Sequence, residues 1–151
     1  MKIPEPFFVI INPIMRFLLR SPVHELWSRG LMLITFTGRN SGRVFTTPVR
    51  YIRNDTTIRC FTSAENQWWR NLRGGADVIL RINGVDRPYK ATAISDDPEA
   101  IRKWLIHYLG EFPQDADYHD IRLTADKGLN PEDLEQALRK AIVVEAEPVR
   151  E

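Results

Sequence analysis

The sequence lacks the cysteines that a disulfide framework or a thiolate metal cluster needs. Cys60 is the single cysteine among 151 residues, so neither an intramolecular disulfide nor a zinc or iron–sulfur cluster held by thiolates can form. This usage is typical of a cytosolic chain, and we expect a cytoplasmic location. His24, His107 and His119 show no metal-ligand spacing with carboxylates or with Cys60. No metal site is predicted.

Charge of one sign is also not in excess. The chain has 21 Lys and Arg against 20 Asp and Glu, a formal net charge of +1. Without a basic stripe there is no global field for nucleic acid, which is not an expected partner, and any anion site must be local. Phosphate-loop and dinucleotide motifs are missing, as is the Gly-x-Ser-x-Gly turn of serine hydrolases.

No apolar run is long enough to span a bilayer. The most apolar segment, PFFVIINPIMRFLL at residues 6–19, is interrupted by Asn12-Pro13, contains Arg16 and shows no cleavage site. We expect it to form a helix packed on the domain. Packing against a partner in a homodimer and lying on a membrane surface, as a peripheral contact, remain the alternatives.

Prolines that directly follow capping residues indicate where helices begin. A side-chain cap followed by proline at the first helical position is a typical helix start. The four pairs are Asn12-Pro13, Ser21-Pro22, Asp97-Pro98 and Asn130-Pro131. They predict helices over about 13–20, 22–29, 98–109 and 131–140, and a fifth short helix is expected near 67–73, before Gly74-Gly75.

Six runs have strand character, and several alternate between apolar and polar residues. They cover 31–37, 44–53, 56–63, 77–83, 85–95 and 141–146. Alternation indicates strands with one buried face. Asn54-Asp55 and Asn83-Gly84 are two-residue hairpin turns, so the strands that they join are expected to be antiparallel neighbours.

These elements predict an α+β fold in one domain covering residues 1–151. We expect a six-stranded antiparallel barrel or strongly coiled sheet in meander order, closed by flanking helices. The N-terminal helices would cover about 12–29, the barrel about 31–95 and 141–146, and a helical crossing about 97–140. Within the crossing, 110–130 reads as one long irregular stretch. Its charged part, GEFPQDADYHD, favours a solvated loop, with a lid over a substrate pocket as the alternative.

The loop GRNSGR between the first two strands carries more than a turn requires. Gly38 and Gly42 allow close backbone approach, Ser41 offers a hydroxyl, and Arg39 and Arg43 offer forked positive charges. Such a loop could hold a phosphate or a carboxylate. Gly, Ser and Asn also dominate ordinary turns, so composition alone leaves a solvated turn as the alternative.

A second group of candidate residues lies in TSAENQWWRNLRGG, residues 62–75. Adjacent residues of a helix point about a third of a turn apart, so Trp68 and Trp69 cannot share one core pocket. We expect one to face the core. The other could line a cleft for a planar ligand or stack on an arginine, although burial is the commoner role of large aromatics.

Together the two segments resemble the deazaflavin (F-420)-dependent nitroreductase family, flavin/deazaflavin oxidoreductases with the split β-barrel of pyridoxamine-phosphate oxidase. GRNSGRVFTTPV is similar to the family's glycine-arginine loop and its following strand, which contains a proline. WWRNLRGGADVILRI is similar to its tryptophan–asparagine run. The similarity covers roughly residues 12–95.

The resemblance implies an oxidoreductase that transfers a hydride from a reduced deazaflavin to an electron-poor small molecule, a quinone or a nitro-compound. It implies a phosphate tail over the loop, a ring in a groove beside the short helix, and Ser63 near the reactive ring as the tentative catalytic residue. The implied cofactor-binding residues are Gly38, Arg39, Asn40, Ser41, Gly42, Arg43, Thr47, Pro48, Val49, Trp68, Trp69 and Asn71.

Two positions depart from the family pattern, and they keep a second function open. Asn40 and Phe45 stand where relatives often have basic residues, so two phosphate contacts are lost, of which Arg43 could restore one. FMN is therefore an alternative cofactor. The alternative function is a split-barrel protein that binds FMN, FAD, heme or lipid without deazaflavin reductase activity.

Overall fold

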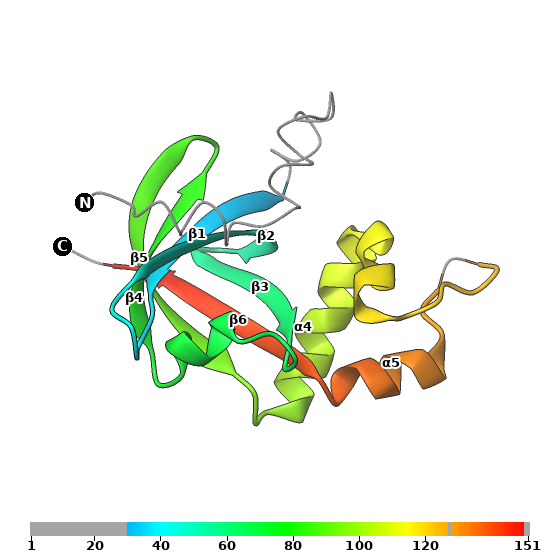
Figure 1. Ribbon diagram of the computed structural model, residues 1–151. Coiled ribbons are helices and arrows are strands. Elements are labelled where there is room, and N and C mark those ends of the chain that lie inside the picture. Colours follow the sequence, from blue (N-terminus) through cyan, green and yellow to red (C-terminus); the bar gives the residue numbers. More distant parts are fainter. Residues whose placement is uncertain (1–29, 127, 150–151) are drawn as a thin grey trace, which may run out of the picture.

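The computed structural model describes residues 30–126 and 128–149, in which six strands and two α-helices are joined by two short 3₁₀ helices (Figure 1). The strands are β1 (Leu31–Thr37), β2 (Val44–Asn54), β3 (Thr57–Ser63), β4 (Ala76–Ile82), β5 (Val85–Ile94) and β6 (Ala141–Pro148). The α-helices are α4 (Pro98–Glu111) and α5 (Pro131–Leu138), and the 3₁₀ helices are η1 (Trp68–Leu72) and η2 (Pro113–His119). The bounds of the strands, of α4, of α5 and of η1 agree with the sequence prediction to within two residues, whereas η2 was not predicted.

The six strands close into an antiparallel barrel in the order β1-β2-β3-β6-β5-β4. This confirms the predicted α+β split-barrel class with flanking helices. The predicted meander order is wrong, because β6 lies between β3 and β5, where it pairs with both. A closed barrel has no free edge, so every strand finds partners on both sides.

Local turn chemistry explains two of the hairpins. Asn83 and Gly84 join β4 to β5 with φ angles of 51° and 80°, the left-handed conformation that a two-residue turn of this kind requires. The turn between β2 and β3 is one residue later than predicted, at Asp55 and Thr56, with Asp55 at a φ of 56°. The predicted antiparallel pairings across both turns are confirmed.

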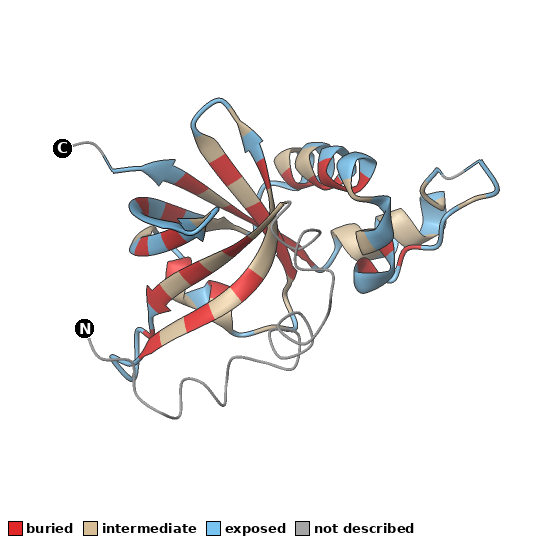
Figure 2. Cartoon of the chain, turned by 90° about the horizontal axis from the view of Figure 1, so that it is seen from above, coloured by how far each residue is buried: buried red, intermediate tan, exposed pale blue. Residues whose placement is uncertain are grey.

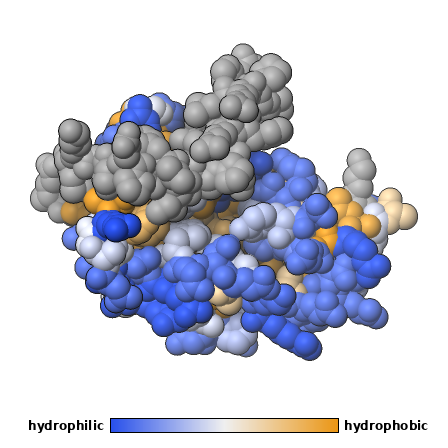
Figure 3. All heavy atoms as spheres, viewed as in Figure 1, coloured by the Kyte–Doolittle hydropathy of each residue, from blue (hydrophilic) through white to orange (hydrophobic). Residues whose placement is uncertain are grey.

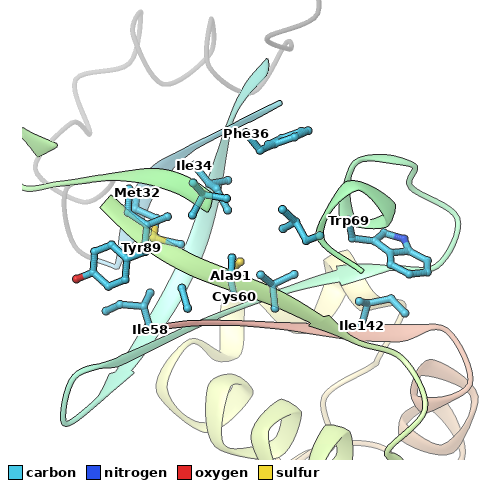
Figure 4. Packing of buried hydrophobic residues seen from close by; sticks show 14 residues of the cluster. Met32, Ile34, Phe36, Ile58, Cys60, Trp69, Tyr89, Ala91 and Ile142 are labelled. Carbon is cyan, nitrogen blue, oxygen red and sulfur yellow. The ribbon is translucent and has the colours of Figure 1, made fainter. Parts of the chain in front are cut away.

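Two hydrophobic clusters lie on opposite sides of the barrel wall. The first fills the barrel interior with alternate residues of the strands and with Trp69 and Leu72 of η1 (Figure 4). The second lies outside, where Ile52, Phe61 and Val143 pack against α4 and η2. In Figure 2 buried residues alternate along the strands and follow one side of α4. The helices therefore cover one side of the barrel, as Figure 1 also shows.

The segment after α4 was predicted to be a solvated loop, and this prediction is wrong because part of the segment is helical and packed. Residues 113–119 form η2, and Ala116, His119 and the following Ile121 are buried. Asp115 is held by Arg50 of β2 at 3.0 Å and accepts a hydrogen bond of 2.7 Å from the hydroxyl of Tyr108. Among the charged residues of this stretch, Ala116 and Ile121 are thus buried apolar residues, which the composition alone did not indicate.

The surface of the described residues is mainly hydrophilic, and in the view of Figure 3 apolar side chains show only in small, separate areas. Exposed large hydrophobic residues, such as Ile79, Ile106 and Leu123, come from different elements. No helix within the described ranges has the length and apolar character to cross a membrane. The two predicted N-terminal helices, and the contacts proposed for them, lie outside the described residues.

Candidate functional site

A groove opens at the barrel end where β1 finishes and β2 begins. It encloses about 340 Å³, a volume within the usual range of small-molecule sites. Its lining residues are Phe36, Phe45, Thr46, Thr47, Asn66, Gln67, Trp68 and Asn71. Three of them are aromatic and the others carry hydroxyl or amide groups, a combination suited to a planar heterocycle that is stacked and hydrogen-bonded.

The aromatic wall comes from strand register and from η1. Phe36 and Phe45 are directly paired across β1 and β2, and their rings stack at 5.7 Å between centroids. Trp68 lies 5.7 Å from Phe36, measured in the same way, and extends the wall onto η1. Phe45, read in the sequence as a lost phosphate contact, is thus part of an aromatic surface.

The two tryptophans separate as expected. Trp69 is 3% exposed and belongs to the interior cluster, whereas Trp68 is half-buried and lines the groove. The guanidinium groups of Arg70 and Arg73 lie 5.3 Å and 4.8 Å from the ring centroid of Trp69. The buried tryptophan, and not the one that lines the groove, is therefore the one that arginines cover.

The glycine-arginine loop is attached to η1 through Asn71. Its side-chain oxygen accepts a hydrogen bond of 2.9 Å from the backbone N–H of Arg39, and its amide group donates one of 3.0 Å to the carbonyl of Trp68. Arg39 also contacts the carbonyl of Arg70 at 3.4 Å. The structure thus brings together the two segments that the sequence singled out separately.

Glycine at position 38 is required by close packing. A Cβ there would lie 2.8 Å from the Ser41 hydroxyl oxygen and 2.9 Å from the Phe45 ring. Gly38 is also fixed from both sides, since its N–H donates to the carbonyl of Arg43 and its carbonyl accepts from the N–H of Gly42. The loop therefore packs directly against one aromatic wall of the groove.

Most backbone donors of this loop are already used within the protein. The N–H groups of Gly38, Arg39 and Gly42 have the partners just given, and that of Arg43 donates to Ser41 Oγ at 3.1 Å. Only the N–H groups of Asn40 and Ser41 have no partner among the described residues of the loop. An anion at this loop would therefore meet chiefly the exposed guanidinium groups of Arg39 and Arg43.

The remaining predicted binding residues lie along β2. Thr47 lines the groove and is paired with Ile34 of β1. Val49 packs on the interior cluster and Pro48 is buried. Neither of these two residues lines the groove. They belong to the same strand as Phe45 and Thr47, which do line it.

Ser63 lies in a second cavity of about 450 Å³, at the same end of the barrel. That cavity also contains residues of η2, of α5 and of the turn before β6. Asn66 lines both cavities, and its amide group donates to Thr62 Oγ1 at 2.8 Å and to the Tyr118 hydroxyl at 3.3 Å. Ser63 Oγ itself accepts a hydrogen bond of 3.3 Å from the N–H of Glu65. The groove and the serine are thus neighbours separated by one side chain.

His119 is the titratable group most changed by its position in this second cavity. It is 8% exposed, and burial lowers its pKa from 6.5 to about 4, against the opposing charges of Asp115 and Asp120. The ring is therefore neutral near pH 7, with edge contacts to Tyr108 and Tyr118. Its Nε2 is buried and has no hydrogen-bond partner among the described residues.

Sequence reasoning missed five residues that line the groove: Phe36, Phe45, Thr46, Asn66 and Gln67. A signal existed for Phe36, because it is the last inward-facing residue of β1 and its strand partner is Phe45. Asn66 and Gln67 lie between a strand and a short helix, and nothing in their spacing distinguishes them from ordinary turn residues.

Comparison with known proteins identifies relatives for this arrangement. A family model described as F420H(2)-dependent quinone reductase matches residues 19–128. A curated Mycobacterium tuberculosis protein named "Putative F420H(2)-dependent quinone reductase Rv3178" is 35% identical over 78 residues, covering 48% of this chain and 65% of the relative. The match thus spans slightly less than two thirds of that relative's length.

Solved structures share the fold at low sequence identity. The conserved hypothetical protein Rv2991 from M. tuberculosis superposes with a TM-score of 0.54 and 17% identity, over 99% of this chain and 87% of the other. A structure described as a domain-swapped dimer gives a TM-score of 0.52 and 16% identity, over 93% and 98% of the two chains. These likenesses concern the architecture of the barrel.

Proposed function

The chain belongs to the F420H(2)-dependent quinone reductase family, and from this premise we propose that it reduces a quinone-type acceptor with a reduced deazaflavin coenzyme. The observation that carries the proposal is the groove walled by Phe36, Phe45 and Trp68, beside a loop with two exposed arginines. When bound, the coenzyme would supply a hydride, which together with one proton converts a quinone to a hydroquinone.

The residues present fit a planar, hydrogen-bonding ring. The aromatic wall offers stacking faces, and the groove side chains of Thr47, Asn66 and Asn71 offer polar contacts at its edge. Asn71 is positioned by its bonds to the loop and to η1, so its orientation is fixed before a ligand arrives. Preorganisation of this kind lowers the entropy cost of binding.

The phosphate-bearing part of the coenzyme would contact Arg39 and Arg43. Both guanidinium groups are exposed beside the groove, and charge-assisted, forked hydrogen bonds suit phosphate oxygens. Arg43 would restore one of the two contacts that Asn40 and Phe45 do not supply. The N–H groups of Asn40 and Ser41 could complete the site.

Ser63 would act on the acceptor side. Ser63 lines the second cavity, and Asn66 lines both that cavity and the groove. A hydroxyl there could donate a hydrogen bond to a quinone oxygen and so stabilise the negative charge that develops during reduction. In this role Ser63 binds and orients the acceptor, while the deazaflavin ring binds in the groove.

A fluorescence-quenching titration of the purified protein tests the proposal. Deazaflavin coenzyme, FMN, FAD and heme are titrated in parallel at one ionic strength, and benzoquinone-dependent oxidation of the reduced deazaflavin is then followed. We expect saturable binding of deazaflavin and turnover with the quinone. Binding of FMN, FAD or heme alone would instead support the second candidate, a flavin or heme protein of the same fold.

Arg39→Ala sharpens this test. Loss of a charge-assisted contact should weaken deazaflavin binding by about tenfold or more, with little change in melting temperature because the side chain is exposed. The matched control is Arg102→Ala, which removes an exposed arginine of α4 that pairs with Glu135. Equal affinities of the two variants would refute the assigned role of the loop.

A further inference from the structure

The barrel end opposite the groove contains another cavity, of about 450 Å³. It lies at the mouth framed by the two hairpin turns and by the end of β6. Its lining residues are Arg53, Asp55, Thr56, Leu80, Ile82, Asn83, Val85, Arg87, Tyr89 and Pro148. None of these residues belongs to the site described above.

Two arginines at this mouth occupy inward-facing positions of their strands. Arg53 of β2 is paired with Ile58, which is fully buried in the interior cluster. Arg87 of β5 is paired with Leu80, which is 1% exposed in the same cluster. Directly paired residues of an antiparallel ladder share one face of the sheet. Alternation alone would therefore place apolar residues at 53 and 87.

Neither guanidinium group has an ion pair or a hydrogen bond with any described residue. Other arginines of the barrel are paired: Arg50 with Asp115, Arg59 with Glu145 and Arg81 with Asp86. Asp55 is the only acidic residue that lines the cavity, and no ion pair joins it to Arg53 or Arg87. The lining thus has a surplus of positive charge.

Tyr89 belongs to the lining of this cavity. Its side chain is 5% exposed as a whole, and its hydroxyl is not among the buried polar atoms that lack a partner, so the oxygen itself is accessible. Figure 4 shows this hydroxyl directed away from the interior cluster, while the ring packs against it. The hydroxyl is therefore placed to donate a hydrogen bond to a ligand atom in the cavity.

We propose that this mouth binds a small amphiphilic carboxylate. The carboxylate accepts forked hydrogen bonds from Arg53 and Arg87 and a further one from the Tyr89 hydroxyl. The apolar part of the ligand lies against Leu80, Ile82 and Val85. This site is at the opposite end of the barrel from the groove, so it does not depend on the proposed function.

Titration calorimetry with octanoate tests the site on the intact protein. We expect saturable binding with a Kd of about 1 mM or tighter, and binding at least about tenfold weaker for octanol and octylamine, which lack the carboxylate. Absence of saturable octanoate binding would overturn the proposal, as would equal affinity for octanol.

Substitutions locate the ligand. Arg53→Gln with Arg87→Gln should weaken octanoate binding by about tenfold or more, and Tyr89→Phe should weaken it severalfold. Arg81→Gln is the matched control, since Arg81 belongs to β4 but pairs with Asp86, and its affinity should equal that of the wild type. Retained affinity in the double variant would place octanoate elsewhere and refute the site.

Thermal unfolding separates binding from a purely structural role. Inward-facing charges can also serve to close a barrel end against association. In that case the double variant would lose solubility or melting temperature and the wild type would not bind octanoate. The proposal requires the reverse, a nearly unchanged melting temperature with lost binding.

Discussion

The backbone N–H of Arg39 donates a hydrogen bond of 2.9 Å to the side-chain oxygen of Asn71, 32 residues later in the chain. This bond joins the glycine-arginine loop to η1. The same side chain donates to the carbonyl of Trp68 and lines the groove. One asparagine therefore fixes the relative position of a candidate anion site and a candidate ring site.

Removing this connection should loosen both parts. We expect Asn71→Ala to lower the free energy of unfolding by about 1 kcal/mol, because two partly exposed hydrogen bonds are lost. It should also weaken deazaflavin binding. Urea unfolding and fluorescence titration measure the two effects. Gln67→Ala is the control, because its side chain lines the same groove without a hydrogen bond among the described residues; if Gln67→Ala has the same effects, the connection is not what matters.

The two tryptophans should respond oppositely to truncation. Trp69→Ala removes a fully packed core side chain and should cost about 3 to 5 kcal/mol of stability. Trp68→Ala removes a half-buried groove wall and should cost less stability but weaken deazaflavin binding by about fivefold, equivalent to about 1 kcal/mol of ring contact. Melting temperature and deazaflavin affinity, measured on both variants, test this difference between the two tryptophans. A Trp68→Ala protein that binds normally would remove this residue from the site.

Ser63→Ala should affect turnover more than coenzyme binding. Ser63 lines the second cavity and not the groove, so deazaflavin affinity should stay within about twofold, whereas kcat with a quinone should fall about tenfold through loss of one hydrogen bond. The comparison requires steady-state rates and a binding titration on the same preparation. Ser63→Thr, which retains a hydroxyl, should recover part of the rate. Unchanged kcat in the alanine variant would contradict the acceptor role.

Stability should fall on acidification because of His119. Its pKa is about 4 in the folded protein, against the ordinary histidine value of 6.5 that applies in the unfolded chain. Between these pH values the unfolded chain therefore binds the proton more readily. The free energy of unfolding then decreases as pH falls from 6.5 towards 4, by about 3 kcal/mol at most.

The His119→Phe variant isolates this contribution. Phenylalanine keeps a ring against Tyr108 and Tyr118 but cannot be protonated, so the fall in stability between pH 6.5 and 4.5 should shrink. His107→Gln, on the exposed side of α4 where His107 meets Glu111, should keep the wild-type profile. Urea denaturation at several pH values gives the answer, and an unaltered pH profile in His119→Phe would assign the effect to other groups.

Much of the secondary structure followed from the sequence, because the responsible interactions are local. Asp97 and Asn130 cap α4 and α5 by accepting bonds from the N–H groups of Ala100 and Asp133, with proline at the next position in each case. Asn83-Gly84 forms the predicted tight turn. Each of these features depends on residues a few positions apart, so turn and capping preferences sufficed.

The resemblance to a family came from two motifs in order, and the family match and the barrel confirm it. The motifs could not predict how the two segments contact each other in the folded protein. The bond between Arg39 and Asn71, the shared lining residue Asn66 and the separation of Ser63 from the groove all depend on contacts across long stretches of chain.

The sequence by itself determined strand alternation, helix starts, hairpin turns and the separation of Trp68 from Trp69, because these are set by local backbone and side-chain geometry. Tertiary structure alone decided that β6 enters between β3 and β5, that His119 of η2 is buried, and that Arg53 and Arg87 line one cavity. Pairing between distant strands is selected by the packing of the whole core, and no local preference encodes that choice.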